Sequence, residues 1–212
     1  TGSGTNNTLT IPGGIQVDDL LVVQQTSNLN AAYPTGPSDN NGGTWNNLTP
    51  VTRTGLGQRN SWRFAIANDA SKLITLTPPT GATGTTVNVG TLHVFRGVDW
   101  NQAIATAQVS TNGSGKTFSC PGFTPAGTAS AATPEYMMCL LSTTAAPGVG
   151  FGSVGGLSAP WTYRSDDGTG AAVENALYGA EVTTTGAFGI GSANNNPVPD
   201  GPGWGAPARV LH

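Results

Sequence analysis

The second half of the chain repeats the residue pattern of the first half at one fixed offset. Four anchor segments align 116 residues apart: Asp19–Val23 with Glu135–Cys139, Trp45 with Trp161, Trp62–Ile66 with Tyr178–Val182, and Val94–Arg96 with Val210–His212. The match is one of residue class more than of identity. A repeat of this kind supplies an equivalent set of strands twice to one folded object. We therefore predict a single domain, residues 1–212, built from pseudo-repeat halves 1–115 and 116–212.

Short apolar segments separated by Gly and Pro predict the fold class. Glycine and proline number 31 and 15 of the 212 residues, and 37% of the residues are hydrophobic. Strands of four to eight residues at this spacing are typical of antiparallel sandwiches and jelly rolls. The pattern predicts an all-β fold, an antiparallel β-sandwich or jelly roll, with loops at 28–43, 148–160 and 194–205. Expected strands cover residues 8–11, 20–24, 45–54, 61–66, 73–77, 87–95, 118–120, 136–141, 161–164, 176–182, 188–190 and 208–211.

Two of the expected strands have further features in their sequence. Trp62, Phe64 and Ile66 alternate with Ser61, Arg63 and Ala65, which predicts a strand with one face buried. The segment Val87–Phe95 is expected as one strand, or as two strands that meet in a bend at Gly90.

Charge and hydropathy exclude two classes of partner. Only 9% of the residues are charged, the net charge is −3, and the eight basic residues form no stripe. Direct binding to nucleic acid is therefore not expected. The longest apolar run is far too short to span a bilayer, so no membrane association is expected.

The two cysteines, Cys120 and Cys139, allow two interpretations. Free cysteine is commonly buried, and both residues lie in or beside apolar strand segments, so we expect two small buried hydrophobic side chains. The alternative is a disulfide closing a short loop, which spacing alone does not establish.

Residues that would carry catalysis or hold a cofactor are scarce. His93 lies among apolar strand residues and is expected as a partly buried or interface histidine. Asp166 and Asp167 are expected in a polar turn, because no alternating acidic loop of the calcium-binding type is present. A hydrolase would require scattered acids such as Asp99, Asp166 and Glu181 to converge. We predict that the protein is not an enzyme and has no catalytic residues, metal site or cofactor.

Aromatic residues are the remaining candidates for a binding site. Trp45 and Trp161 occupy equivalent positions and are expected in the core. Tyr33, Trp100 and Trp204 lie in expected loops or beside them. An exposed aromatic ring can stack on a sugar or anchor a subunit interface. These three residues are the predicted interface or glycan-stacking positions.

Short motifs in the first half resemble a known structural family. Val17–Val23 is followed by Trp45, then by Trp62 with Ala65, then by His93–Asp99. This order is similar to a β-sandwich (jelly-roll-like) type found in structural proteins of tailed bacteriophage virions and in some bacterial surface proteins. Those proteins often read GDLLVV and then FRGVD. Here Asp18 stands where the usual glycine would be, and the second half follows the pattern only in residue class.

The resemblance implies a structural or adhesive role and carries over no catalytic residue. We expect a phage virion structural protein, located on the capsid surface or the tail. The size of the chain favours a capsid decoration or cement protein that binds at capsid subunit junctions. Its expected partners are the major capsid protein or other virion proteins, and we expect a homo-oligomer. Contacts are expected from loops 28–43 and 146–160 or from the termini. The alternative is a tail- or fibre-associated module that binds a host glycan.

Overall fold

The computed structural model shows an antiparallel all-β chain that divides into two compact units, Thr1–Trp100 and Asn101–His212. It describes residues 2–3, 6–29, 32–48, 50–53, 56–66, 68–69, 72–83, 86–98, 108–112, 117–120, 130, 135–143, 162–167, 173–183, 191–194 and 204–211. These residues include no helix, so the prediction of an all-β fold is confirmed. The single-domain prediction stays a prediction.

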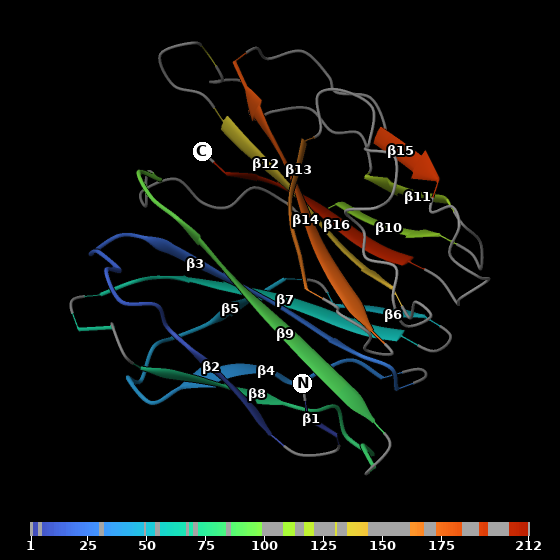
Figure 1. Ribbon diagram of the computed structural model, residues 1–212, viewed down its shortest axis with the longest axis horizontal. Coiled ribbons are helices and arrows are strands. Elements are labelled where there is room, and N and C mark those ends of the chain that lie inside the picture. The colour runs from blue at the N-terminus through green and yellow to red at the C-terminus, as the bar shows by residue number, and fades with distance from the viewer. Residues whose placement is uncertain are drawn as a thin grey trace. The chain divides into compact units, whose positions relative to one another are not determined.

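Unit 1 contains two antiparallel sheets (Figure 1). Its strands are β1 (Gly2–Ser3), β2 (Asn7–Thr10), β3 (Leu20–Ser27), β4 (Gly36–Asp39), β5 (Asn46–Asn47), β6 (Val51–Arg53), β7 (Leu56–Phe64), β8 (Leu73–Thr77) and β9 (Val87–Phe95). The larger sheet has the order β1-β9-β3-β7-β5, with β6 also paired to β7, and the smaller sheet has the order β2-β8-β4. The central strand β3 is buried along its whole length.

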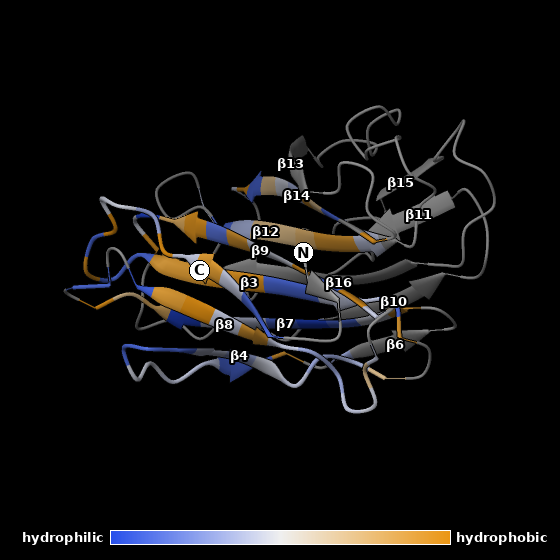
Figure 2. Cartoon of the chain, turned by 60° about the horizontal axis from the view of Figure 1, so that its bottom comes forward, coloured by the Kyte–Doolittle hydropathy of each residue, from blue (hydrophilic) through white to orange (hydrophobic). Residues whose placement is uncertain are grey.

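One hydrophobic core joins the two sheets of unit 1. Its buried members are Ile11, Leu21, Val23, Ala65, Ile74 and Leu76. Leu21 and Val23 come from β3, whereas Ile74 and Leu76 come from β8 of the smaller sheet. Figure 2 shows that β3 changes from hydrophobic at its start to hydrophilic along its second half, where the sequence reads Gln-Gln-Thr-Ser. The core is therefore apolar at one end of β3 and amide-rich at the other.

Unit 2 contains a five-stranded antiparallel sheet and a two-stranded sheet. Its strands are β10 (Gln108–Asn112), β11 (Thr117–Cys120), β12 (Glu135–Thr143), β13 (Thr162–Asp167), β14 (Glu174–Val182), β15 (Gly191–Asn194) and β16 (Trp204–Leu211). The larger sheet has the order β10-β16-β12-β14-β13, and β11 pairs with β15. Met137 to Leu141 on the central strand β12 are fully buried.

The larger sheets of the two units arrange their strands in the same order, with β9, β3, β7 and β5 in the places of β16, β12, β14 and β13. In unit 1, Leu20 of β3 lies opposite Phe95 of β9. In unit 2, Tyr136 of β12 lies opposite Leu211 of β16, and both residues are displaced by 116. The equivalence of the two halves stays a prediction, which this shared order supports.

One of the four aligned anchors is wrong by one residue. Leu20 lies opposite Phe64 of β7, whereas Tyr136 lies opposite Glu181 of β14, so β14 is displaced by 117. Trp62 therefore corresponds to Gly179 and not to its aligned partner, Tyr178. A shift of one residue moves a strand's side chains to the opposite face, which a class-level alignment does not detect.

Most predicted strands are present, but β1, β10 and β15 lie outside the expected strands, and three further elements differ from the expectation. The predicted loop 28–43 contains β4, whose sequence Gly-Pro-Ser-Asp carries no strand-forming residue type. β9 runs unbroken through Gly90, without the alternative bend. β16 begins at Trp204, so the predicted loop 194–205 ends too late. The expected strand 188–190 and the loop 146–160 lie outside the described residues.

Candidate functional site

Two residues of the motifs that carry the resemblance, Asp19 and Arg96, meet beside one turn of unit 1. Asp19 begins the buried part of the first motif, and Arg96 follows β9 in the last motif. The Arg96 guanidinium donates two hydrogen bonds to the Asp19 carboxylate, from Nε to Oδ1 at 3.0 Å and from Nη2 to Oδ2 at 2.9 Å. Arg96 Nη2 also donates to the Gly14 carbonyl, and the Gln16 N–H donates to Asp19 Oδ2. The motif therefore holds a turn closed and leaves neither carboxylate oxygen free.

The Asp19–Arg96 pair makes the fold sensitive to acid. Hydrogen bonding from Arg96 holds the pKa of Asp19 below its usual value, against the opposing effect of burial. The pair therefore stabilises the fold above the unfolded carboxyl pKa of about 4, and this contribution is lost as pH falls through the folded pKa. We expect Asp19→Asn to unfold at lower urea concentration than the wild type at pH 6 and to show a smaller further loss below pH 4. An equal acid-induced loss in both proteins would contradict this role.

Asp18 explains why related motifs have glycine at this place. Its φ is 68°, in the left-handed region, where a residue with a Cβ pays a steric penalty that glycine does not. We expect Asp18→Val to lower the free energy of unfolding by about 1–2 kcal/mol and Asp18→Gly to cost nothing or to stabilise slightly. Gln16→Val, at an exposed position of the same turn without a positive φ, is the control in urea unfolding. Equal effects of the two valine substitutions would show that backbone strain is not the cause.

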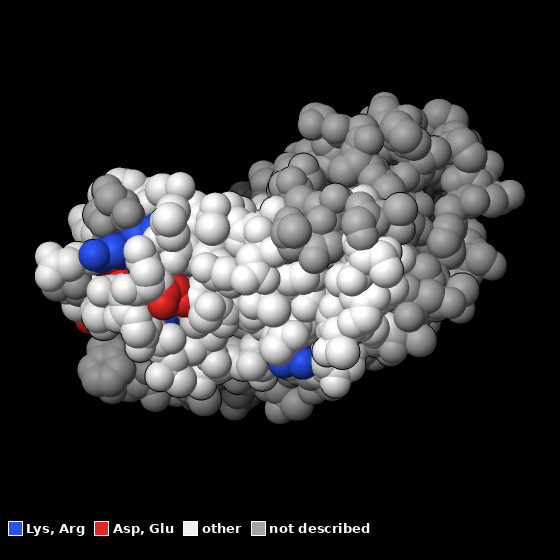
Figure 3. Space-filling view, turned by 90° about the horizontal axis from the view of Figure 1, so that it is seen from below, with Lys and Arg blue, Asp and Glu red and all other residues white. Residues whose placement is uncertain are grey.

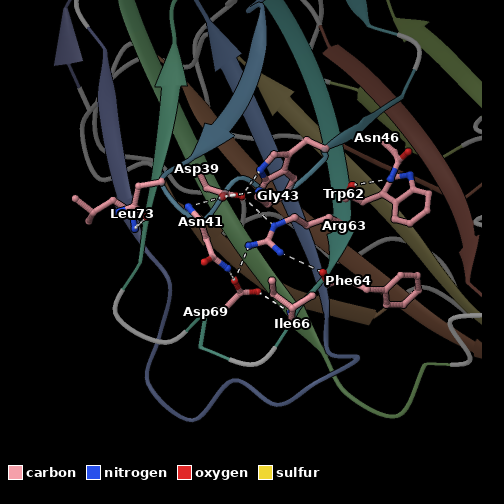
Figure 4. Close-up of polar contacts among 12 residues, drawn as sticks. Asp39, Asn41, Gly43, Asn46, Trp62, Arg63, Phe64, Ile66, Asp69 and Leu73 are labelled. Atoms are coloured by element: carbon pink, nitrogen blue, oxygen red, sulfur yellow. Dashed lines mark hydrogen bonds and ion pairs between the residues drawn. The ribbon is translucent and has the colours of Figure 1, made fainter.

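A second ionic cluster lies inside unit 1, centred on Arg63 of β7 (Figure 4). The Arg63 side chain is 4% exposed, and its Nε lies 3.0 Å from Asp39 Oδ2 in an ion pair that lacks hydrogen-bond alignment. The same oxygen accepts a hydrogen bond from Trp45 Nε1 at 2.8 Å. Asp39 Oδ1 accepts from the N–H groups of Asn41 and Gly43. Both oxygens of the Asp39 carboxylate are therefore bound.

Asp69 completes this Arg63 cluster. Its Oδ1 lies 2.9 Å from Arg63 Nη2 and also accepts from the side-chain amide of Asn41. Its Oδ2 accepts from the Ile66 N–H at 2.9 Å. The guanidinium also lies over the Trp45 ring, 5.4 Å from its centroid. Because both carboxylates are saturated by groups of the chain itself, the cluster is suited to holding segments 39–45 and 66–69 against β7, and not to binding a ligand.

Tyr33 is the one predicted site residue whose side chain the structure describes. It is 42% exposed, and the Arg59 guanidinium lies over its ring at 4.8 Å from the centroid. The chain around Tyr33 presses against β7, since a Cβ on Gly57 would lie 1.6 Å from the Ala32 carbonyl oxygen. Asn47, whose Oδ1 accepts from Ser61, is exposed and lies beside Gly36. An exposed ring, a cation and an amide therefore share one patch, which we call the Tyr33 patch.

The structure does not bring the three predicted aromatic residues together. Trp204 begins β16 of unit 2, where its backbone pairs with Asn112, and nothing further is described of its side chain. Trp100 lies outside the described residues, as does Trp161. Trp45 is partly buried and packs against the core of unit 1, as predicted.

His93 is buried, as expected of a histidine among apolar strand residues. It is 7% exposed, and its Nε2 has no hydrogen-bond partner in the part of the chain that the structure describes. Burial lowers the pKa of His93 to about 4, because the charged ring would lose its hydration. The ring is therefore neutral at pH 7, and no acid or cysteine cluster of the metal-binding kind accompanies it among the described residues.

The expectation of two buried free thiols is wrong. Cys139 is fully buried on β12, but it is disulfide-bonded. Cys120 is the only other cysteine in the chain. The alternative, a bond that closes the segment between β11 and β12, is therefore the one that the structure supports.

The acids named for a possible hydrolase do not converge where the structure describes them. The predicted turn at Asp166 and Asp167 is wrong, since both residues lie in β13, and Asp166 is opposite Ala176 of β14. Glu181 lies five residues further along β14, which is about 17 Å at the usual strand rise. Asp99 lies outside the described residues. Within the described ranges no three His, Cys, Asp or Glu side chains gather to hold a metal ion, and no helix has the length and apolar character to cross a membrane.

The sequence interpretation missed Arg63 and Arg59. The alternating pattern was recognised, but the face with Ser61, Arg63 and Ala65 is the more buried one, whereas Trp62 and Phe64 are only partly buried. The sequence does contain a signal for Arg63. It alternates with the small residue Ala65 on one face of the strand, and an arginine on a face that points to the core must pair with acids from elsewhere in the chain. Arg59 gave no such signal, since its contact with Tyr33 joins residues 26 positions apart in sequence.

No protein-family model, curated protein or solved structure matches this chain.

Proposed function

We propose that the protein is a structural component of a bacteriophage virion, and within that class a capsid decoration or cement protein. The observation that carries the proposal is the use of the motif residues. Asp18, Asp19 and Arg96, which carry the resemblance, form a turn and an internal ion pair. Because these motif residues stabilise the fold, the motif is characteristic of a structural β-scaffold and not of a reaction centre.

The surface of the chain suits a role in a repeated assembly. Charged residues make up 9% of the sequence, and Lys, Arg, Asp and Glu cover only small parts of the described face in Figure 3. Short side chains such as Thr, Ser, Asn and Ala lose little rotamer freedom when an interface forms. The cost of ordering such a surface against a capsid lattice is correspondingly low.

The internal binding of three carboxylates supports the proposal of a non-enzymatic role. The carboxylates of Asp19, Asp39 and Asp69 are bound by arginine, tryptophan or backbone N–H groups. A general acid or base needs a carboxyl group within reach of a substrate proton. These three carboxylates are instead held by groups of the chain itself. We propose that the protein acts by binding at junctions between subunits of the major capsid protein.

Particle fractionation tests this proposal directly. Virions from the source would be purified on a density gradient, and the protein would be quantified by mass spectrometry in each fraction. We expect it to co-migrate with intact particles at a fixed ratio to the major capsid protein. Purified protein should also rebind particles stripped of it and raise the temperature at which they release DNA. Absence from particles, together with no rebinding, would overturn the proposal.

The Tyr33 patch favours a second candidate, a glycan-binding module on a tail or fibre. Sugar rings stack on exposed aromatic faces, while arginine and asparagine donate hydrogen bonds to hydroxyl groups. Under this function, a glycan array should give hits that Tyr33→Ala abolishes. The matched control is Leu73→Ala, an equally exposed residue on β8. An array without hits would leave the capsid role as the better candidate.

A further inference from the structure

Each unit contains a large sheet and a small one, and the two small sheets differ in size. In unit 1 the small sheet has three strands, and Ile74 and Leu76 of β8 lie in one core with Val23 of β3. Among the described residues of unit 2, the small sheet consists of β11 and β15 alone, paired over four positions (Figure 1). A two-stranded sheet is at most marginally stable by itself. The small sheet of unit 2 therefore needs an attachment to the rest of its unit.

The sequence of this small sheet offers little apolar surface for such an attachment. Strand β15 reads Gly-Ser-Ala-Asn, whereas β8, which pairs antiparallel with β2 in the small sheet of unit 1, reads Leu-Ile-Thr-Leu-Thr. Strand β11 reads Thr-Phe-Ser-Cys and has one large hydrophobic residue. Burial of apolar side chains is the main favourable contribution when one sheet packs on another. The two strands can supply much less of it than their counterparts in unit 1.

The disulfide of unit 2 lies where unit 1 has a core contact. Cys139 is fully buried on β12, the central strand of the large sheet, and it is disulfide-bonded. Since Cys120 is the only other cysteine, the bond joins the last residue of β11 to this central strand. At the repeat offset of 116 residues, Cys139 corresponds to Val23, which packs in the core of unit 1. Unit 2 therefore has a covalent bond at the position where unit 1 has an apolar packing residue.

We propose that the bond between Cys120 and Cys139 is a redox-sensitive latch. Closed, it fixes the β11–β15 sheet to the large sheet of unit 2, and reduction releases that sheet while the large sheet stays folded. Thiol pools of reducing compartments open bonds of this kind, and oxidising compartments keep them closed. The state of the small sheet therefore follows the redox state of the surroundings. This inference stands independently of the proposed capsid or glycan role.

The latch opens and closes by thiol–disulfide exchange. In the reducing direction, one thiolate of an external dithiol attacks a sulfur of the bond, forms a mixed disulfide, and displaces the other cysteine as a thiolate. The second thiol of the reagent then displaces the first cysteine. The protein gains two electrons and two protons in all, and the dithiol becomes a disulfide. A small-molecule disulfide is the oxidant that reverses both steps.

Hydrogen–deuterium exchange of the full chain, with and without dithiothreitol, tests this latch. Alkylation of free thiols followed by mass spectrometry verifies that the bond is present before reduction and absent afterwards. On reduction, we expect the backbone N–H groups of β11 and β15 to exchange at least about tenfold faster, because the crosslink no longer restricts opening of these strands. The exchange of β3 and β8 should stay unchanged, since unit 1 contains no cysteine.

Cys139→Val tests the latch without a reductant, because valine is the residue that unit 1 has at the corresponding position. This variant should exchange β11 and β15 as fast as the reduced wild type, and dithiothreitol should change nothing further. The matched control is Met138→Leu, which alters the neighbouring buried residue of β12 and keeps the bond. It should protect β11 and β15 like the oxidised wild type.

Three results would overturn the proposal. The first is a chain with two free thiols before reduction. The second is unchanged exchange of β11 and β15 in Cys139→Val and in the reduced protein. The third is exchange that rises equally in β12, β14 and β16, since the bond would then hold the whole of unit 2 and not its small sheet.

Discussion

Replacing Arg63 by methionine is expected to lower the free energy of unfolding by about 3–5 kcal/mol, because removing one partner of a buried ion pair leaves uncompensated charge. Asp39 and Asp69 both bind the guanidinium, and the side chains of both acids are fully buried. Methionine keeps most of the length of the stem, so the loss reports the charge and its hydrogen bonds. Urea unfolding of the full chain at pH 7 measures it.

Arg59→Met is the matched control for this prediction. Arg59 lies on the same strand and stacks on Tyr33, but it forms no ion pair with the described acids. A surface cation–π contact contributes about 0.5–1 kcal/mol, so the control should lose no more than about that amount. Similar losses in the two variants would mean that the Arg63 cluster is not what holds segments 39–45 and 66–69 in place.

Mild acid is expected to destabilise the protein through His93. Burial lowers the pKa of His93 to about 4, whereas an unfolded histidine titrates near 6.5. The unfolded chain therefore binds a proton first as pH falls, and the free energy of unfolding drops by about 2 kcal/mol between pH 7.5 and pH 5. The loss approaches about 3 kcal/mol at pH 4 and then levels off, since both states are protonated at lower pH.

Comparison with His93→Gln isolates this effect. Glutamine does not titrate, so the variant should show a nearly flat free energy of unfolding between pH 7.5 and 5, measured by urea titration at each pH. Asp19→Asn is the control, because its effect belongs below pH 4 and it should keep the loss at pH 5 seen in the wild type. If His93→Gln loses as much stability at pH 5 as the wild type does, the histidine is not the group responsible.

The sequence pattern predicted the strands best where apolar runs end at proline or glycine. β8 was predicted residue for residue, because Leu73–Thr77 alternates and stops at Pro78. The expected strand 45–54 is present as two short strands, β5 and β6, on either side of Pro50. β4 was missed because its pairing with β8 supplies the stability that its own residues lack. Strands of this kind are decided by tertiary contacts and not by local propensity.

The Arg63 cluster could not be predicted from local pattern. Its acids lie 24 residues before and 6 residues after Arg63. The first lies in the predicted loop 28–43 and the second between the predicted strands 61–66 and 73–77. Only the folded chain shows that β4, which ends at Asp39, lies against β7. The close approach of Ala32 to Gly57 is another such contact, since it depends on which backbone passes over the strand. The candidate sites were predicted least well: of the three proposed aromatic residues, the structure describes only Tyr33 fully.

The residues of the short motifs have structural roles in the turn beside β3 and β9. The aspartate at position 19 and the arginine at position 96 are 77 residues apart, yet they form one bidentate pair. The glycine expected at position 18 is replaced by aspartate at a left-handed φ, which aspartate tolerates better than most residues do. Both positions are explained by the turn that they build. The resemblance therefore concerns the β-scaffold, and the virion role is the proposal that this scaffold supports.

Cryo-electron microscopy of virions from the source tests the central proposal most directly. We expect density for the chain on the capsid surface, at symmetric junctions between major capsid subunits. The two units, whose large sheets have the strand orders β1-β9-β3-β7-β5 and β10-β16-β12-β14-β13, would be fitted to this density. Density found only at the tail would contradict the capsid role and favour adhesion through the Tyr33 patch. Particles without any density for this chain would contradict the virion assignment itself.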